Sequence, residues 1–205
     1  EIAVTDGNDG VTYTMSGSTL YFASLPSNLV YLYDTKRLDS EQYIDDMDVN
    51  VTIYENGIPI NATNFPDEAF RSYVRSEFDS DNDGYLSDEE IGSVTEMYFS
   101  GYSTESLKGI EYFTSLTALG CSNNQLTALD VSKNTALTKL WCGNNKLTAL
   151  DISSNINLTV LHCEYNQLSS LDVSKNTAIT DLHCSQNNLK KLDLSNNTRL
   201  TALDC

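Results

Sequence analysis

The sequence has few positive charges, with 12 Lys and Arg residues against 29 Asp and Glu residues. A formal net charge of −17 would be repelled by nucleic-acid phosphates and by anionic lipid headgroups. No apolar run approaches the roughly 18–20 residues that a membrane-spanning helix needs. We therefore expect no nucleic-acid partner and no membrane insertion.

Recognisable catalytic motifs are also missing. The chain contains no nucleophile elbow, no glycine-rich phosphate loop and no zinc-hydrolase motif. No charged-then-apolar leader stands at Glu1, so we expect any secretion signal to have been removed or to lie outside the sequence. Together these absences favour a binding protein over an enzyme.

The acidic residues are unevenly distributed. Residues 1–115 hold 22 acidic and 5 basic residues, whereas residues 116–205 hold seven of each. This shift in composition marks a module boundary. The acidic surplus is typical of a soluble exported protein or of a cation binder.

The second half of the chain repeats every 21 residues. Cysteines recur at this step, at Cys121, Cys142, Cys163, Cys184 and Cys205. An asparagine follows each of the first four cysteines by three residues, at Asn124, Asn145, Asn166 and Asn187. Because one coil this short cannot bury its own apolar face, the repeat predicts stacked coils that share a single core.

Each coil is expected to contain one short strand. Alternation along the strand turns Leu119 and Cys121 inward and Gly120 outward. The asparagine after the strand can satisfy backbone groups where the chain turns. An irregular coil, with Phe99 in the cysteine position, precedes the regular ones and is expected to cap the core.

This pattern, over residues 94–205, resembles the cysteine-ladder leucine-rich repeats of internalin-like bacterial surface proteins. The resemblance implies an α/β fold, a curved right-handed solenoid with a parallel β-sheet on its concave face. It also implies adhesion or recognition of a ligand by the repeats, in a secreted or cell-surface protein.

The cysteines are expected to be inert core residues. In-register thiols on neighbouring parallel strands do not suit disulfides, and free buried cysteine behaves as a small hydrophobic residue. His162 and His183 immediately precede two of the cysteines, so alternation turns the imidazoles to solvent and the thiols to the core. This excludes those neighbours as Cys–His dyads.

Residues 79–90 read D-S-D-N-D-G-Y-L-S-D-E-E and match an EF-hand calcium loop. The loop takes oxygen ligands at positions 1, 3, 5, 7, 9 and 12, with glycine at position 6. The matching ligands are Asp79, Asp81, Asp83, the carbonyl of Tyr85, Ser87 and Glu90. The alternative is an acidic turn in which Ser87 and Glu90 form a capping box. We expect Ca²⁺ as the cofactor.

The flanks of this loop resemble an EF-hand or dockerin-type motif. A helix is predicted from Pro66-Asp67-Glu68 to about Phe78, and the second helix is cut short by the first repeat strand. A dockerin carries two loops, and the chain has one. The division expected is a β-rich segment over 1–63, a helical calcium-binding cap over 64–93, and the solenoid over 94–205.

Within residues 1–63 we predict strands at 11–15 and 19–22, and a hairpin of 49–54 with 58–60 through Asn56-Gly57. Residues 38–47 are predicted as a short helix or loop. We infer no function for this segment.

The outward positions of the repeat strands are the candidate ligand surface. The candidate residues are Lys139, Trp141, His162, Glu164, Tyr165, Asp181, His183 and Asp204. An exposed Trp beside imidazoles could stack on a sugar or anchor a peptide. The alternative is that these positions are simply tolerant of variation, and a metal at His162, His183 and Asp204 is a further possibility.

The sequence leaves three functions open. The first is a binding or adhesion module for a protein ligand on the concave face. The second is a glycan-binding or scaffolding accessory region of a larger exported polysaccharide-degrading enzyme. The third is a structural spacer. A monomer is expected unless the last coil, which lacks a polar cap, pairs with another molecule.

Overall fold

The computed structural model describes residues 2–5, 13–16, 19–22, 31–34 and 57–205. The chain forms two compact units, Glu1–Gly57 and Ile58–Cys205. The described residues of the first unit form two antiparallel strand pairs: β1 (Ile2–Thr5) with β4 (Tyr31–Asp34), and β2 (Tyr13–Ser16) with β3 (Thr19–Phe22).

The strands β2 and β3 overlap those predicted at 11–15 and 19–22. The segments predicted at 38–47 and 49–54 lie outside the described residues.

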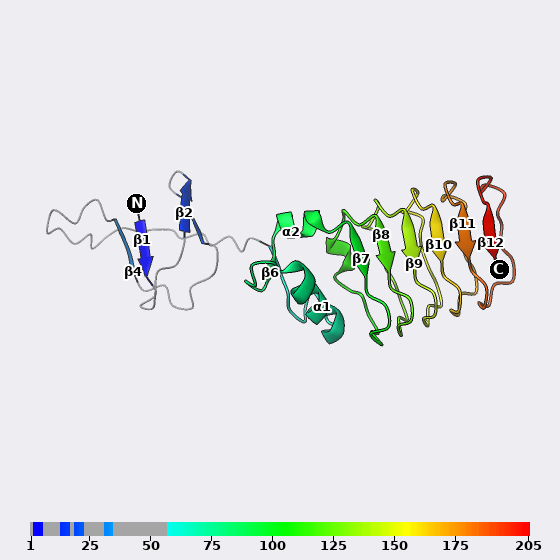
Figure 1. Ribbon diagram of the computed structural model, residues 1–205, viewed down its shortest axis with the longest axis horizontal. Helices are drawn as coiled ribbons and strands as arrows, with labels where there is room; N and C mark the ends of the chain where they lie inside the picture. Colours follow the sequence, from blue (N-terminus) through cyan, green and yellow to red (C-terminus); the bar gives the residue numbers. More distant parts are fainter. Residues whose placement is uncertain (1, 6–12, 17–18, 23–30, 35–56) are drawn as a thin grey trace. The chain divides into compact units, whose positions relative to one another are not determined.

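The second unit begins with a small cap on the solenoid (Figure 1). Its elements are β5 (Ile58–Pro59), α1 (Glu68–Phe78), β6 (Tyr85–Leu86) and α2 (Asp88–Ser93). The strand β5 pairs antiparallel with β6, so that Ile58 lies opposite Leu86. Ile60 is buried in the core, which makes residues 58–63 part of the cap and places the division after Gly57 rather than after residue 63.

Helix α1 begins and ends where its sequence indicates. The Asp67 side chain accepts a hydrogen bond from the N–H of Phe70 and caps the first turn. Phe70 and Val74 are buried one turn apart on the face that meets the solenoid, where Phe70 packs against Phe99 with ring centroids 5.4 Å apart. The first coil therefore begins on the aromatic face of the cap.

The solenoid contains one six-stranded parallel sheet in sequence order (Figure 1). Its strands are β7 (Glu96–Tyr98), β8 (Ala118–Gly120), β9 (Lys139–Trp141), β10 (Val160–His162), β11 (Asp181–His183) and β12 (Ala202–Asp204). Each is three residues long and pairs in register with the next, with a step of 22 residues from β7 to β8 and of 21 residues in the four pairings from β8 to β12. The predicted leucine-rich-repeat solenoid is confirmed.

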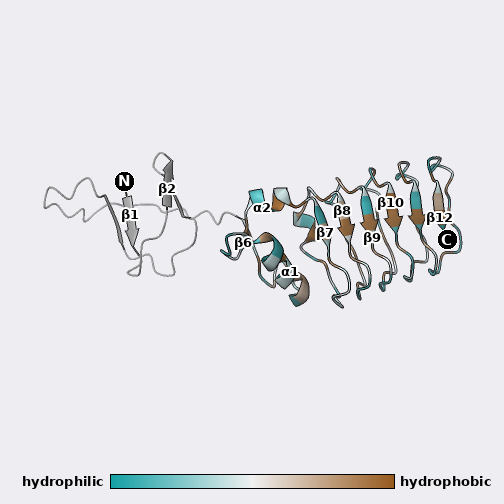
Figure 2. Ribbon diagram, viewed as in Figure 1, coloured by the Kyte–Doolittle hydropathy of each residue, from teal (hydrophilic) through white to brown (hydrophobic). Residues whose placement is uncertain are grey.

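Hydrophobic residues recur in each successive strand (Figure 2). Leu119, Leu140, Leu161 and Leu182 have no exposed surface, and Phe99 occupies the predicted cysteine position in the first coil. All five thiols are free; the first four are buried and Cys205 is exposed. The buried side chains of successive coils form one continuous core, because a single coil cannot bury its apolar face alone.

Two columns of buried asparagines connect neighbouring coils through side-chain hydrogen bonds. Asn145 donates to the carbonyls of Cys121 and Cys142, at 3.1 and 3.0 Å, and accepts from the N–H of Leu126. A second column, which includes Asn155, is also buried: Asn155 donates to the carbonyls of Val131 and Asn134 in the preceding coil. Asn145 thus satisfies backbone groups of its own coil and of the preceding one, whereas Asn155 satisfies two carbonyls of the preceding coil.

No helix in the described part of the chain is long and apolar enough to cross a membrane.

Candidate functional site

The acidic loop joins α1 to α2. Carboxylate oxygens of Asp79, Asp81 and Asp83 lie within 4.8 Å of one another. Asp79 is almost fully buried and accepts from the N–H groups of Asp83 and Gly84, both at 3.1 Å. Gly84 has a φ of 85°, which glycine adopts without strain, so the predicted turn at position 6 is present.

Glu90 lies apart from this three-carboxylate cluster. Its Oε1 accepts from the N–H and hydroxyl of Ser80, both at 2.7 Å, and its Oε2 accepts from the N–H and hydroxyl of Ser87, both at 2.9 Å. Ser87 in turn caps α2, which completes a capping box. The structure therefore contains the capping box given above as the alternative, beside three of the predicted calcium ligands.

The carboxylates in this loop perturb one another. Burial raises the pKa of Asp83, as do the charges of Asp81, Asp79 and Glu90, against the lowering effect of the hydrogen bond from the N–H of Tyr85. Burial also acts to raise the pKa of Glu90, but the hydrogen bonds from Ser87 and Ser80 outweigh it and hold the pKa below its ordinary value. A bound cation would relieve the repulsion within the cluster.

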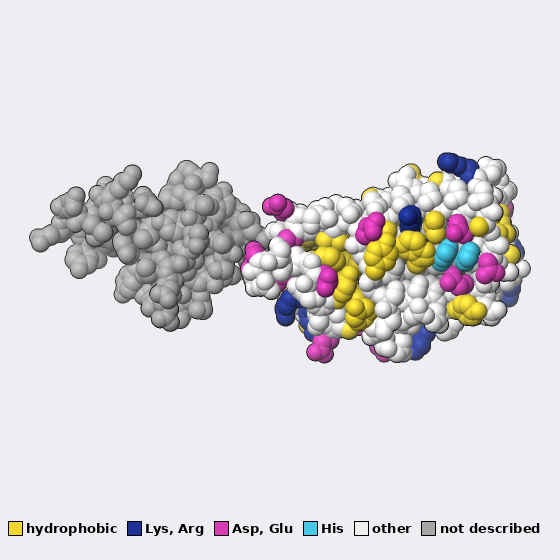
Figure 3. Space-filling model, in the orientation of Figure 1, with side chains coloured by type: hydrophobic (Ala, Val, Ile, Leu, Met, Phe, Trp, Pro, Cys, Tyr) yellow, Lys and Arg dark blue, Asp and Glu magenta, His cyan; other side chains and the backbone are white. Residues whose placement is uncertain are grey.

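A second candidate site lies on the outward-facing side of the parallel sheet, hereafter the sheet face. Its central row contains Tyr98, Trp141, His162 and His183, one from each of β7, β9, β10 and β11. Figure 3 shows the two histidines side by side among acidic side chains, with hydrophobic side chains next to them. The row crosses the sheet because the pairing is in register.

Tyr98 is a member of this row that the sequence reasoning missed. Its strand pairs so that Tyr98 lies opposite Gly120, and Gly120 lies opposite Trp141. Since Gly120 has no side chain, Tyr98 leans over it, and its ring centroid comes within 6.1 Å of that of Trp141. The sequence signal that could have predicted this contact is Gly120, an outward-facing glycine on the strand next to residues 96–98.

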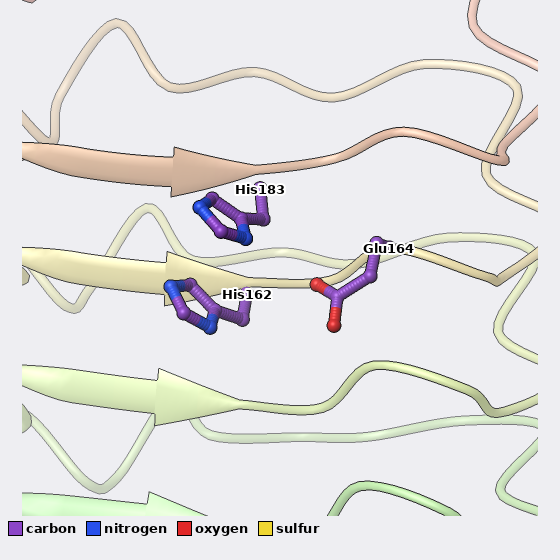
Figure 4. Close-up of side chains that lie close together, drawn as sticks. All are labelled: His162, Glu164 and His183. Atoms are coloured by element: carbon purple, nitrogen blue, oxygen red, sulfur yellow. The ribbon is translucent and has the colours of Figure 1, made fainter. Parts of the chain in front are cut away.

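The histidines form the polar end of the row. Their rings are stacked, with centroids 4.1 Å apart and planes 6° from parallel, and Trp141 meets His162 edge-on at 6.4 Å. Glu164 lies beside both imidazoles (Figure 4). Asp181 contacts the Nε2 atoms of both.

The remaining predicted ligand residues lie at the margins of this group. Lys139 is exposed on β9, and Tyr165, with 58% of its surface exposed, follows β10. Asp204 accepts a hydrogen bond from the Ser185 hydroxyl at 2.7 Å. The sequence suggested Asp204 as the carboxylate of a possible metal site with His162 and His183. In the structure the carboxylate that groups with the two histidines is Glu164.

Comparisons with known proteins agree with this architecture. The family model "Leucine Rich repeats (2 copies)" matches residues 114–155. Internalin J of Listeria monocytogenes serotype 4b (strain F2365) is 43% identical over 71 residues, which are 35% of this chain and 8% of that protein.

Two solved structures from the same species are similar over most of the chain. The functional domain of InlJ, described as including a cysteine ladder, has a TM-score of 0.68 and 40% identity, over 74% of this chain and 34% of that one. An internalin, inlF, has a TM-score of 0.66 and 29% identity, over 71% and 44% respectively. The chain spans less than half of either relative. It contains an internalin-like leucine-rich-repeat domain whose relatives include one with a cysteine ladder.

Proposed function

We propose that this chain is a secreted or cell-surface binding module that recognises a protein ligand through the sheet face, and that it is not an enzyme. The observation that carries the proposal is the row of Tyr98, Trp141, His162 and His183 across a rigid sheet. The similarity to internalins supports a surface or secreted location and a role in adhesion.

The chemistry of the row suits protein recognition. Tyr98 is 53% exposed, and aromatic side chains supply large contact areas at little conformational cost. Asp181 and Glu164 provide charged groups beside the two histidines, and Lys139 is exposed on the neighbouring strand β9. A partner with an apolar anchor and a polar rim would match both parts of the surface.

Glycan recognition is the second candidate, because the rings of Tyr98 and Trp141 are inclined by only 36° to each other on one surface. Two such rings could stack against successive sugars. This would suit an accessory region of a larger exported polysaccharide-degrading enzyme.

Binding of the labelled full chain to arrays of extracellular proteins and of glycans separates these candidates. We expect saturable binding to a protein, weakened at least tenfold by Trp141→Ala and by His162→Ala, because both remove side chains from the row. Ile156→Ala is the matched control, since Ile156 is 56% exposed in the turn before β10.

Binding confined to glycans would favour the accessory-region candidate. Binding to neither array, or equal binding by wild type and both sheet-face variants, would contradict the proposal and leave a spacer role.

We also propose that the loop 79–90 binds Ca²⁺ and stabilises the cap on the solenoid. Supporting this are the convergence of three carboxylates and the oxygen chemistry of the donor set, which is the kind that calcium prefers. Ser87, Glu90 and the carbonyl of Tyr85 would complete the ligands, with Glu90 leaving its contacts to Ser80. The helix before this loop packs on Phe99 of the first coil, so order in the loop would be transmitted to the solenoid.

Thermal unfolding with and without calcium tests this role. For a dissociation constant of about 10⁻⁴–10⁻³ M, 10 mM Ca²⁺ should add about 1.4–2.7 kcal/mol of stability. Asp83→Asn should abolish the gain, whereas Glu77→Gln, which removes the same charge from nearby α1, should keep it. An unfolding midpoint that is equal in calcium and in chelator would exclude the calcium site.

A further inference from the structure

The stacked histidines face a carboxylate. Ligand atoms of His162, His183 and Glu164 lie within 4.8 Å of one another. Figure 4 shows one nitrogen of each imidazole on the side of Glu164 and the other nitrogen turned away. Two imidazoles and one carboxylate are a donor set that borderline divalent metals such as Zn²⁺ accept.

Asp181 holds the opposite edges of both rings. Its Oδ2 lies 3.2 Å from Nε2 of His162, and its Oδ1 lies 3.2 Å from Nε2 of His183. The first contact is a hydrogen bond, and the second has ion-pair distance without hydrogen-bond alignment. With the Nε2 proton of His162 held by Asp181, its Nδ1 lone pair is free, which is the outer-shell arrangement that orients metal-binding histidines, and the short distance from Asp181 to Nε2 of His183 favours the same tautomer there.

The position of Glu164 is prepared by the neighbouring coil. Gly143 has no side chain, and a Cβ there would lie 2.5 Å from Oε1 of Glu164. The carboxylate therefore rests on bare backbone, with its Oε2 buried and without a hydrogen-bond partner among the described residues. A buried carboxylate oxygen that lacks a donor is costly, and a cation would offset that cost.

We propose that His162, His183 and Glu164 bind a divalent transition-metal ion of the Zn²⁺ class on the sheet face, with Asp181 as the residue that positions both imidazoles. The ion would take Nδ1 of each histidine and one oxygen of Glu164. The fourth coordination position faces the outer surface of the sheet. This site goes beyond the proposed ligand recognition and does not depend on it.

Binding requires both rings to turn out of the stack, because stacked parallel rings direct their in-plane nitrogen lone pairs along parallel lines instead of toward one ion. Tetrahedral coordination with Zn–N bonds of about 2.0–2.1 Å sets the two nitrogens roughly 3.3–3.4 Å apart, so the parallel rings must tilt toward each other. The side chains of His162 and His183 are 22% and 37% exposed, which leaves room for this tilt. The site is chemically distinct from the acidic loop, whose all-oxygen donors prefer hard cations.

Titration of the full chain with Zn²⁺ and Co²⁺ tests the proposal. Millimolar Ca²⁺ is kept present to occupy the acidic loop, and Cys205→Ser removes the one exposed thiol. We expect one equivalent to bind by calorimetry with a dissociation constant on the order of 1–10 µM, and a Co²⁺ absorption spectrum typical of four-coordination. Trp141, the single tryptophan, should report Co²⁺ binding by fluorescence quenching because it contacts His162.

Four variants define the ligands. His162→Ala and His183→Ala should each weaken binding by at least 100-fold, and Asp181→Asn by about 10–100-fold because it disturbs orientation and not coordination. Gly143→Ala should weaken binding by displacing Glu164. Asp204→Asn is the matched control and should bind like wild type, since Asp204 is engaged with Ser185.

Protection of the wild-type histidines from diethyl pyrocarbonate by Zn²⁺ gives a measurement that needs no folded variant. The proposal is overturned if the folded wild-type chain takes up neither metal under these conditions, or if the double variant His162→Ala/His183→Ala retains the bound equivalent.

Discussion

Two glycines determine how neighbouring side chains are arranged on the sheet face. Gly120 gives Tyr98 access to Trp141, and Gly143 gives the Glu164 carboxylate a place on the backbone. Both lie in outward positions that the sequence pattern marks as variable. The columns of outward residues follow from the 21-residue step, but the contacts between them depend on rotamers and on a neighbour's missing Cβ, which the step does not encode.

The buried thiols behave as core residues at this scale. Burial raises the pKa of Cys121 to about 12 and that of Cys184 to about 11, and it also raises the pKa of Cys142 and Cys163. Iodoacetamide at pH 8 should therefore modify one thiol, Cys205, in the folded chain and all five in guanidinium chloride. Mass spectrometry gives the count, and modification of Cys142 at the rate of Cys205 would contradict the account.

Asn145 should be among the most sensitive polar positions. Replacement by alanine leaves the carbonyls of Cys121 and Cys142 and the N–H of Leu126 without this partner in a buried place. We expect the free energy of unfolding to fall by about 2–4 kcal/mol in urea titrations. Asn157→Ala, at an exposed asparagine with one long hydrogen bond, should change it by less than about 0.5 kcal/mol. Equal losses of unfolding free energy in the two variants would argue that the buried asparagine column does not stabilise the solenoid.

At the scale of elements, local sequence signals predicted the boundaries well. Asp67 begins α1, and the first repeat strand shortens α2. The partner of Ile58–Pro59 was not predictable in this way, because β5 pairs with β6 across 25 intervening residues and not through a tight turn. Pairing in the short cap depends on tertiary packing, whereas the four strand pairings from β8 to β12 are repeated by the same spacing of 21 residues.

The turns on the return side of each coil share one hydrogen-bonding pattern, in which an aspartate carboxylate accepts a backbone N–H. The carboxylates of Asp130, Asp151, Asp172 and Asp193 each accept the N–H of the serine two residues later, at 2.9 Å. Hydrogen bonds from these serines hold the pKa of all four aspartates below the ordinary value.

A folded-state pKa below the unfolded one stabilises the fold above the unfolded value, about 3.9, and this contribution is lost as pH falls through the folded value. The thermal unfolding midpoint should therefore be lower at pH 2.5 than at pH 5. The variant Asp151→Asn/Asp172→Asn should show a smaller drop, because asparagine keeps an acceptor that does not titrate. Identical profiles for variant and wild type would exclude this role.

For the whole molecule, the period alone predicted the architecture. A constant step of 21 residues requires in-register strands, and the sheet and core follow from it. The function follows less directly, because the repeat specifies a scaffold and the surface carries the recognition. Tyr98 belongs to the irregular first coil and escaped the column analysis, while the pairing of Glu164 with the histidines crosses two coils.

We expect a protein ligand to bind on the sheet face. Site-specific photo-crosslinking tests it most directly, with p-benzoylphenylalanine at Tyr165 beside the row and, as control, at Ile156 in the turn before β10. We expect a cross-link to the array-identified protein ligand from position 165 alone, and its loss when Trp141→Ala is added. Equal cross-linking from position 156, or cross-linking at 165 that survives Trp141→Ala, would contradict it.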